Sequence, residues 1–151
     1  MKNILFIIFS IFITLVCCKY NDKNDIDTGN IKNIELYKEY MNKYKNKEIL
    51  TFLEGDFNGD NISDLIIIYR ESNNSNKLIG LYTNEKGKIL MTNPIPAPIE
   101  NYIVKFYNID EKEPQEFLVT GQKGANIGFA VYRLENGEFI SLFESGMERC
   151  C

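Results

Sequence analysis

The feature that most constrains the fold is an internal repeat. Residues 55–60 form an acidic loop that leads into the apolar run 65–70, and residues 107–112 form a similar loop that leads into the run 117–120. Each copy continues into a hairpin, and the proline-rich segment 94–98 separates the copies as a stiff linker. Because one unit of this size cannot bury its own apolar face, the two copies are predicted to pack on each other.

The spacing of apolar residues predicts one helix followed only by strands. Ile34, Tyr37, Met41 and Tyr44 recur at helical spacing within residues 31–48, which predicts an amphipathic helix with a packed stripe. After this segment the period changes to two, and turns containing Asn and Gly separate the runs. The predicted strands cover residues 49–53, 65–69, 78–82, 88–91, 103–107, 116–120, 129–133 and 138–143.

The expected fold class is therefore mainly β with one N-terminal helix (α+β). Short strands joined by tight turns favour antiparallel sheets. The two repeats resemble single blades of β-propellers of the FG-GAP or VCBS kind. Since two blades cannot close a propeller, residues 31–143 are predicted to form one domain in which the copies pack on each other and on the helix.

The start of the chain has the form of a secretory signal, because a charged beginning is followed by a short apolar run. The run closes on Leu15-Val16-Cys17-Cys18, which resembles a bacterial lipobox. On this interpretation residues 1–17 are removed and Cys18 carries the lipid. Lipidation of Cys17 would leave a threonine at the position of Leu15, and a plain secretory signal is the remaining alternative.

A lipobox has consequences for place and partners. Residues 18–30 are polar and are predicted to form a flexible tether, so the domain is expected at the extracytoplasmic face of the cell membrane, held there by its lipid anchor. The formal net charge is −4 for the whole chain, and removal of Lys2 makes it −5. This balance does not favour nucleic acid as a partner.

The composition also excludes several kinds of catalysis. The chain contains no histidine, which removes serine- and cysteine-type hydrolysis through histidine and histidine-ligated zinc catalysis. The glycine-containing segment 121–128 lacks the ending of a phosphate-binding loop and is interpreted as a long hairpin connection. No catalytic residue is predicted, and the chain is interpreted as a binding protein rather than an enzyme.

The first acidic loop has the pattern of a structural calcium site. Side-chain oxygens stand at loop positions one, three, five and nine, where alternate residues can converge on one hard cation. This resembles the calcium loops of propeller-blade repeats. The predicted ligands of Ca²⁺ are Asp56, Asn58, Asp60, Asp64 and the carbonyl of Ile62. A solvated turn rich in Asp and Asn, with no ion, is the alternative.

In the second loop the pattern is weaker. Asn108 and Asp110 match the ligands at loop positions one and three, but Lys112 stands at position five and Glu116 at position nine. The ammonium of Lys112 is expected to neutralise the carboxylates internally, so no ion is predicted there.

The chain ends in two adjacent cysteines. With Cys17 removed and Cys18 capped by lipid, Cys150 and Cys151 are the remaining thiols, and no disulfide framework is possible. Residues 144–151 show no period and are predicted to form a mobile tail. Arg149 is expected to favour the thiolate of Cys150. Such a thiol pair binds soft ions such as Hg(II), Cu(I) or Zn(II), or it forms a strained disulfide.

The ending Glu148-Arg149-Cys150-Cys151, together with the layout of the chain, resembles the Cys-Cys-COOH (seleno)protein family SaoC of selenocysteine-assisted organometal resistance systems. The resemblance implies that Cys150 and Cys151 accept or relay Hg²⁺ or organomercurial compounds outside the cell. It also implies a possible partnership with an organomercurial lyase or a metal transporter.

Two other classes of function remain open from the residues alone. One is a thiol-disulfide redox protein. The strained ring that a disulfide between adjacent cysteines forms argues against this class. The other is a calcium-stabilised surface lipoprotein with no thiol chemistry.

Overall fold

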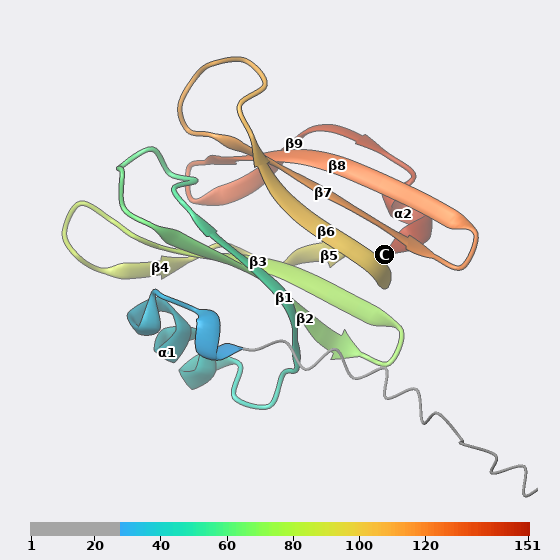
Figure 1. Cartoon of the computed structure of the whole chain (residues 1–151), viewed down its shortest axis with the longest axis horizontal. Coiled ribbons are helices and arrows are strands. Elements are labelled where there is room, and N and C mark those ends of the chain that lie inside the picture. The colour runs from blue at the N-terminus through green and yellow to red at the C-terminus, as the bar shows by residue number, and fades with distance from the viewer. Residues whose placement is uncertain (1–27) are drawn as a thin grey trace, which may run out of the picture.

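The chain builds three layers, a helix and two stacked sheets (Figure 1). This computed structural model describes residues 28–151. After a 3-10 turn at Thr28–Asn30 and helix α1 (Ile34–Lys43), the first sheet contains β1 (Ile49–Gly55), β2 (Asp64–Ser72), β3 (Ser75–Thr83), β4 (Ile89–Met91) and β5 (Ile95–Ala97). The second sheet contains β6 (Glu100–Tyr107), β7 (Glu116–Lys123), β8 (Asn126–Glu135) and β9 (Glu138–Ser145), and helix α2 (Met147–Cys150) ends the chain.

Both sheets are antiparallel, and consecutive strands are neighbours in each. The first has the order β1-β2-β3-β4, with β5 also paired to β3, and the second has the order β6-β7-β8-β9. The predicted fold class, mainly β with an N-terminal helix, is confirmed, and each of the eight predicted strands overlaps one observed strand. The expected long connection at residues 121–128 is instead a tight turn, because β7 and β8 stay paired as far as Lys123 and Asn126.

Two predicted segments differ from the structure. Helix α1 is shorter than residues 31–48 because the side chain of Asn33 caps it by accepting from the N–H of Leu36. Its fully buried side chains are Leu36 and Tyr40, whereas Ile34 of the predicted stripe is exposed. The linker at residues 94–98 contains the short strand β5, which pairs with β3.

Two apolar cores hold the layers together. Strand β2 is buried on both faces and takes part in both cores. Leu65, Ile67 and Tyr69 face α1, while Ile66 and Ile68 face the second sheet, as the alternation of side chains along a strand requires. The two repeats therefore pack on each other, and the helix covers the outer face of the first sheet (Figure 1).

Candidate metal sites

The terminal thiols lie on a folded element and not on a mobile tail. Strand β9 continues to Ser145, and Gly146 then turns the chain with a positive φ of 71°. The last residues form α2, in which Met147 and Cys150 are buried. The carbonyl of Cys150 accepts a hydrogen bond of 3.0 Å from the N–H of Ile99. The predicted tail at residues 144–151 is therefore wrong, because two apolar side chains one turn apart anchor it.

A glycine on β8 makes room for the buried thiol. A Cβ atom on Gly128 would lie 2.5 Å from the Sγ atom of Cys150 and 2.8 Å from the carbonyl oxygen of Gly146. Any larger residue at this position would force α2 away from the sheet. The position of Cys150 thus depends on a glycine in the second repeat.

Three sulfur atoms come together at this end of the chain. The Sγ atom of Cys150 lies 3.6 Å from the Sγ atom of Cys151 and 3.8 Å from the Sδ atom of Met147. Cys150 is fully buried, while Cys151 is partly exposed. A pocket of about 310 Å³ opens beside them, lined by Pro96, Tyr132, Glu144, Met147, Glu148 and Cys151. The cluster is thus accessible through Cys151.

Met147 was missed from the sequence. The signal that could have found it is the spacing Met-x-x-Cys-Cys, which places a thioether three and four residues before the thiols. On a helix these positions share one face. No periodicity predicted a helix in residues 144–151, so nothing in the sequence placed Met147 on the same face as the cysteines.

The surroundings of Cys151 keep its thiol protonated. Burial raises its pKa to about 12, the hydrogen bond with Cys150 and the nearby Glu144 carboxylate act in the same direction, and Lys123 opposes them. The guanidinium of Arg149, which was expected to favour the thiolate of Cys150, is exposed and pairs with Glu148 at 3.2 Å. Metal binding at this site must therefore displace protons.

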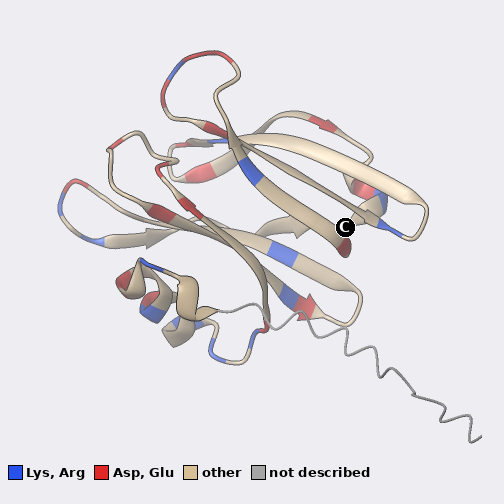
Figure 2. Ribbon diagram, in the orientation of Figure 1, with Lys and Arg blue, Asp and Glu red and all other residues tan. Residues whose placement is uncertain are grey.

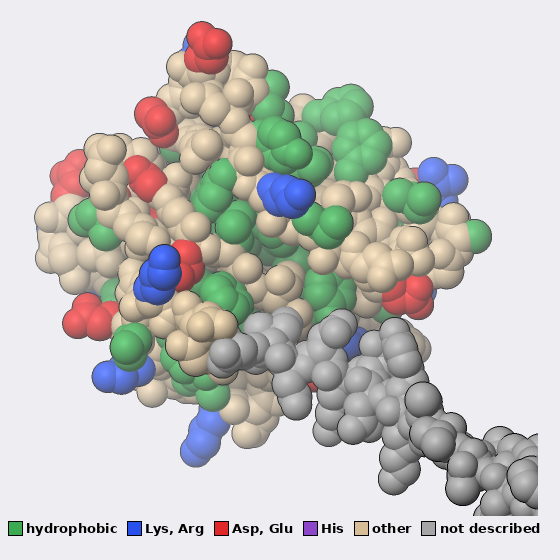
Figure 3. All heavy atoms as spheres, in the orientation of Figure 1, with side chains coloured by type: hydrophobic (Ala, Val, Ile, Leu, Met, Phe, Trp, Pro, Cys, Tyr) green, Lys and Arg blue, Asp and Glu red, His purple; other side chains and the backbone are tan. Residues whose placement is uncertain are grey.

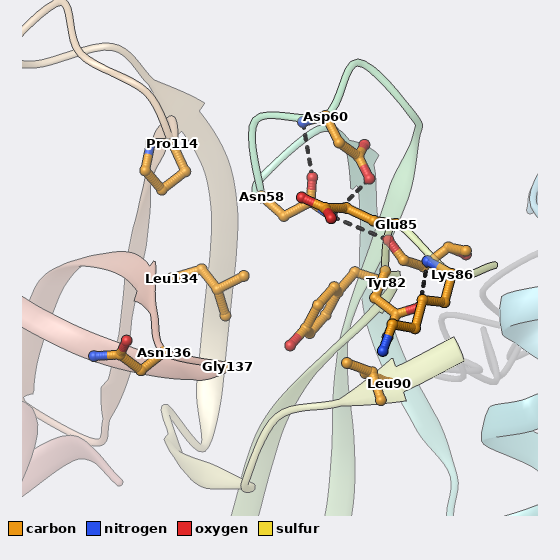
Figure 4. A pocket seen from close by; sticks show the side chains of 12 residues that line it. Asn58, Asp60, Tyr82, Glu85, Lys86, Leu90, Pro114, Leu134, Asn136 and Gly137 are labelled. Atoms are coloured by element: carbon orange, nitrogen blue, oxygen red, sulfur yellow. Dashed lines mark hydrogen bonds between the residues drawn. The ribbon is translucent and has the colours of Figure 1, made fainter. Parts of the chain in front are cut away.

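The second candidate site is the first acidic loop, residues 56–64. The Oδ1 atom of Asp56 accepts from the N–H groups of Asn58 and Gly59, at 3.2 and 2.7 Å. The Oδ1 atom of Asn58 accepts from the N–H of Asp60 at 2.9 Å, and the Oδ1 atom of Asp60 accepts from the N–H of Ile62 at 2.8 Å. Figure 4 shows Asn58 and Asp60 beside a cleft of about 530 Å³ between the two repeats.

Asp64 is the exceptional member of this loop. Its side chain is fully buried, and its Oδ2 atom accepts from the N–H of Phe57 at 3.0 Å, but its Oδ1 atom has no hydrogen-bond partner. Burial raises its pKa to about 7, and the carboxylates of Asp60 and Asp56 add to this, while N–H groups of Phe57 and Asn58 oppose it. A buried carboxylate of this kind is costly unless a proton or a cation accompanies it.

In the second repeat, a cationic side chain of the protein lies beside the corresponding buried carboxylate. Glu116 is also fully buried, and its Oε2 atom accepts from the N–H of Ile109, seven residues earlier, as Asp64 accepts from Phe57. The guanidinium of Arg133 contacts the other oxygen of Glu116 and lies 2.6 Å from Asp110. The cation is thus Arg133 and not the predicted Lys112, which contributes only its backbone N–H to Asp110.

The register of the strands shows what replaces Arg133 in the first repeat. Phe117 pairs with Tyr132 in the second sheet, and Leu65 pairs with Leu81 in the first. The residue after each partner stands opposite the buried carboxyl, so the position of Arg133 is occupied by Tyr82 in the first repeat. Acidic residues mark both loops at the same end of the sheets (Figure 2), but a protein cation accompanies them in the second repeat alone.

Neither candidate site consists of charged side chains alone. Within residues 28–151, no three Cys, Asp or Glu side chains converge as they would around a bound metal. In the acidic loop this follows from the hydrogen bonds that its carboxylates make to backbone N–H groups. At the thiols the third donor is a thioether. The residues fit a metal only if Asn58 and backbone oxygens, or Met147, complete the ligand set.

No family model matches the chain, and it matches no curated protein and no solved structure. The likeness of the repeats to propeller blades and the resemblance to the SaoC family therefore stay predictions. Cys17, Cys18 and most of the expected tether lie outside the described residues. Over residues 28–151, none of the helices has the length and apolar character needed to cross a membrane.

Proposed function

We propose that this chain is an extracytoplasmic, lipid-anchored protein that captures or relays soft metal ions and organomercurials through Cys150 and Cys151, as part of an organometal resistance system. The observation that carries the proposal is the cluster of three sulfurs beside an open pocket. Thiolates and thioethers are the ligands that soft metals prefer.

The distances between the sulfurs suit metal coordination. With metal–sulfur bonds of about 2.3 Å, two ligands at a tetrahedral angle lie about 3.8 Å apart, and two ligands on opposite sides of the metal lie about 4.6 Å apart. The distances of 3.6 and 3.8 Å around Cys150 match the tetrahedral case. A three- or four-coordinate ion is thus accommodated with small movements, while a linear two-thiolate Hg(II) complex requires the thiols to separate by about 1 Å.

Burial assigns different roles to the two thiols. Cys151 borders the pocket and is the entry thiol, while the fully buried Cys150 is the retaining thiol. In the capture step Cys151 forms a bond to the metal of an incoming metal–thiolate complex, and the carrier's thiolate leaves with the proton of Cys151. Cys150 then displaces a second carrier thiol in the same way. This reverses the expectation that Cys150 reacts first.

Titration with Hg(II), in the presence of an equal concentration of glutathione, tests the proposal in a chain whose Cys17 and Cys18 are both changed to Ser, so that Cys150 and Cys151 are its only thiols. One ion is expected per chain, together with loss of binding when Cys150 and Cys151 are both changed to Ser. Changing Ser141 and Ser145 of β9 to Ala provides the control and leaves binding unchanged. Unaltered stoichiometry in the double cysteine variant, with unaltered phenylmercury sensitivity of cells that carry it, contradicts the proposal.

A second function is favoured by Asp64. We infer that the first loop binds Ca²⁺ through Asp56, Asn58, Asp60, Asp64 and the carbonyl of Ile62, and that the ion is structural. Its support is the contrast between the repeats: the buried carboxyl has Arg133 beside it in one and an unpaired Oδ1 atom in the other. Calcium takes six to eight oxygen ligands, so backbone oxygens or water complete the site.

Calorimetric titration with Ca²⁺ tests this second function. Binding is expected to raise the melting temperature of the wild-type chain and to leave that of Asp64→Asn unchanged. The absence of both heat and stabilisation in the wild type excludes the site.

A further inference from the structure

The outer face of the second sheet carries an unusual amount of exposed apolar surface. Side chains at alternate positions of β6 and β8 point away from the core between the sheets. In β9 a bulge places both Leu142 and Phe143 on this side, and Ile109 lies at the rim. Their exposed fractions run from 38% to 68%, and Figure 3 shows hydrophobic side chains over this sheet. The outer face is defined by Ile103, Tyr107, Ile109, Ile127, Phe129, Ile140, Leu142 and Phe143.

The first sheet shows how the fold treats such a surface elsewhere. Its outer face is covered by α1, which buries Leu65, Ile67 and Tyr69 of β2. In the second sheet no described residue plays the part of α1, and the rings of Phe129 and Phe143 lie 5.6 Å apart at the surface. Contiguous exposed apolar patches of this size mark interaction sites.

We propose that this outer face binds the outer face of a second copy of this chain, forming a two-fold symmetric dimer. The exposed surface of these eight residues amounts to about 800 Å² per copy, which is the order of what each partner contributes to an interface of standard size. In the stacking of the two repeats, one sheet face packs on another. Because α1 covers the outer face of the first sheet, the described part of the same chain offers no second bare sheet face, whereas a second copy offers its own outer face and gives a closed two-fold pairing.

The charges favour a protein partner over a lipid surface. The guanidinium of Arg133 on this face is already paired with Asp110 and Glu116. Lys105 of β6 is able to extend its head to the rim of the face. Protein surfaces that lie on membranes surround their apolar face with Lys and Arg, whereas this chain has a net charge of −4.

The molar mass of the full chain, purified in detergent and measured by sedimentation equilibrium over a dilution series, tests the dimer. The wild type is expected at twice the chain mass at high concentration. Ile127→Lys and Phe143→Lys, made separately at exposed positions, are each expected to halve the mass. Ile34→Lys is the matched control, because Ile34 on α1 is 56% exposed, much as Phe143 is at 58%, but lies on the other side of the molecule, and this variant is expected to stay dimeric.

Association through residues 1–27 affects all variants alike, so the difference between the face variants and the control isolates the outer face. A wild type that is monomeric throughout the dilution series overturns the proposal, and so does equal dimerisation of the face variants and the wild type.

Discussion

Replacing Asp64 by Asn should stabilise the metal-free protein at neutral pH, although it removes a buried group that accepts a hydrogen bond. Burial raises the pKa of Asp64 from an ordinary value of 3.8 to about 7. Each tenfold change in proton affinity corresponds to about 1.4 kcal/mol, so the ionised carboxylate destabilises the fold by up to about 4 kcal/mol. The amide carries no charge, and it keeps an oxygen for the N–H of Phe57.

The sign of the pH dependence follows from the raised pKa. The folded protein binds the proton of Asp64 more tightly than the unfolded chain does, so the penalty is absent below about pH 4. It grows as the pH rises to about 7 and is constant above that. An unpaired amide N–H group in the variant costs about 1–3 kcal/mol, so the net gain at pH 8 is about 1–3 kcal/mol.

Urea unfolding in EDTA at pH 4.5 and pH 8 measures both quantities. The wild type should lose stability between these pH values relative to Asp64→Asn, and the variant should be the more stable protein at pH 8. Glu116→Gln is the matched control in the other repeat. There the change leaves Arg133 without one of its two anions, and a loss of stability is expected because an ion pair with the buried Glu116 is broken. The reasoning is refuted if Asp64→Asn destabilises the protein at pH 8 as Glu116→Gln does.

Three further changes test the thiol site. Met147→Leu preserves the packed volume and should lower the affinity of the protein for Cu(I) by about tenfold or more. Met41→Leu on α1 is the control and should have no effect. Equal affinities in the two variants would mean that the thioether of Met147 is not a ligand. Gly128→Ala should cost about 1–3 kcal/mol in thermal unfolding and expose Cys150 to thiol reagents; unchanged stability together with an unreactive Cys150 contradicts this. Alkylation of Cys151 in the metal-free protein should be slow at pH 8, and its rate should rise about tenfold per pH unit up to about pH 11, because the pKa of this thiol is about 12. A rate that levels off near pH 8 contradicts this.

Local patterns were sufficient to predict the sheets. The apolar run of β2 and the alternation in β8 depend on neighbouring residues, and tight turns fix the antiparallel pairing of consecutive strands. The repeat likewise predicted that the two halves pack on each other. Strand β5 was missed because Pro94, Pro96 and Pro98 oppose a strand locally, and only its pairing with β3 reveals it.

The site was predictable only in part. The sequence identified both cysteines, but α2 has four residues and is held by a space above Gly128, about twenty residues away in the chain. The cation of the second loop was assigned to Lys112, which is adjacent in sequence, whereas Arg133 reaches Glu116 from the next strand. In both cases a contact between distant parts of the chain decided the outcome, and no local pattern contains it.

X-ray absorption spectroscopy of the Hg(II)-loaded chain, with Cys17 and Cys18 changed to Ser so that Cys150 and Cys151 are its only thiols, tests the central claim most directly, because it counts the atoms bound to the metal. Sulfur ligands are expected at roughly 2.3–2.5 Å, two of them from Cys150 and Cys151, with a more distant third sulfur that disappears in Met147→Leu. A metal surrounded by oxygen or nitrogen alone, or a spectrum unchanged when both cysteines are replaced by Ser, would contradict the assignment of this cluster as the metal site.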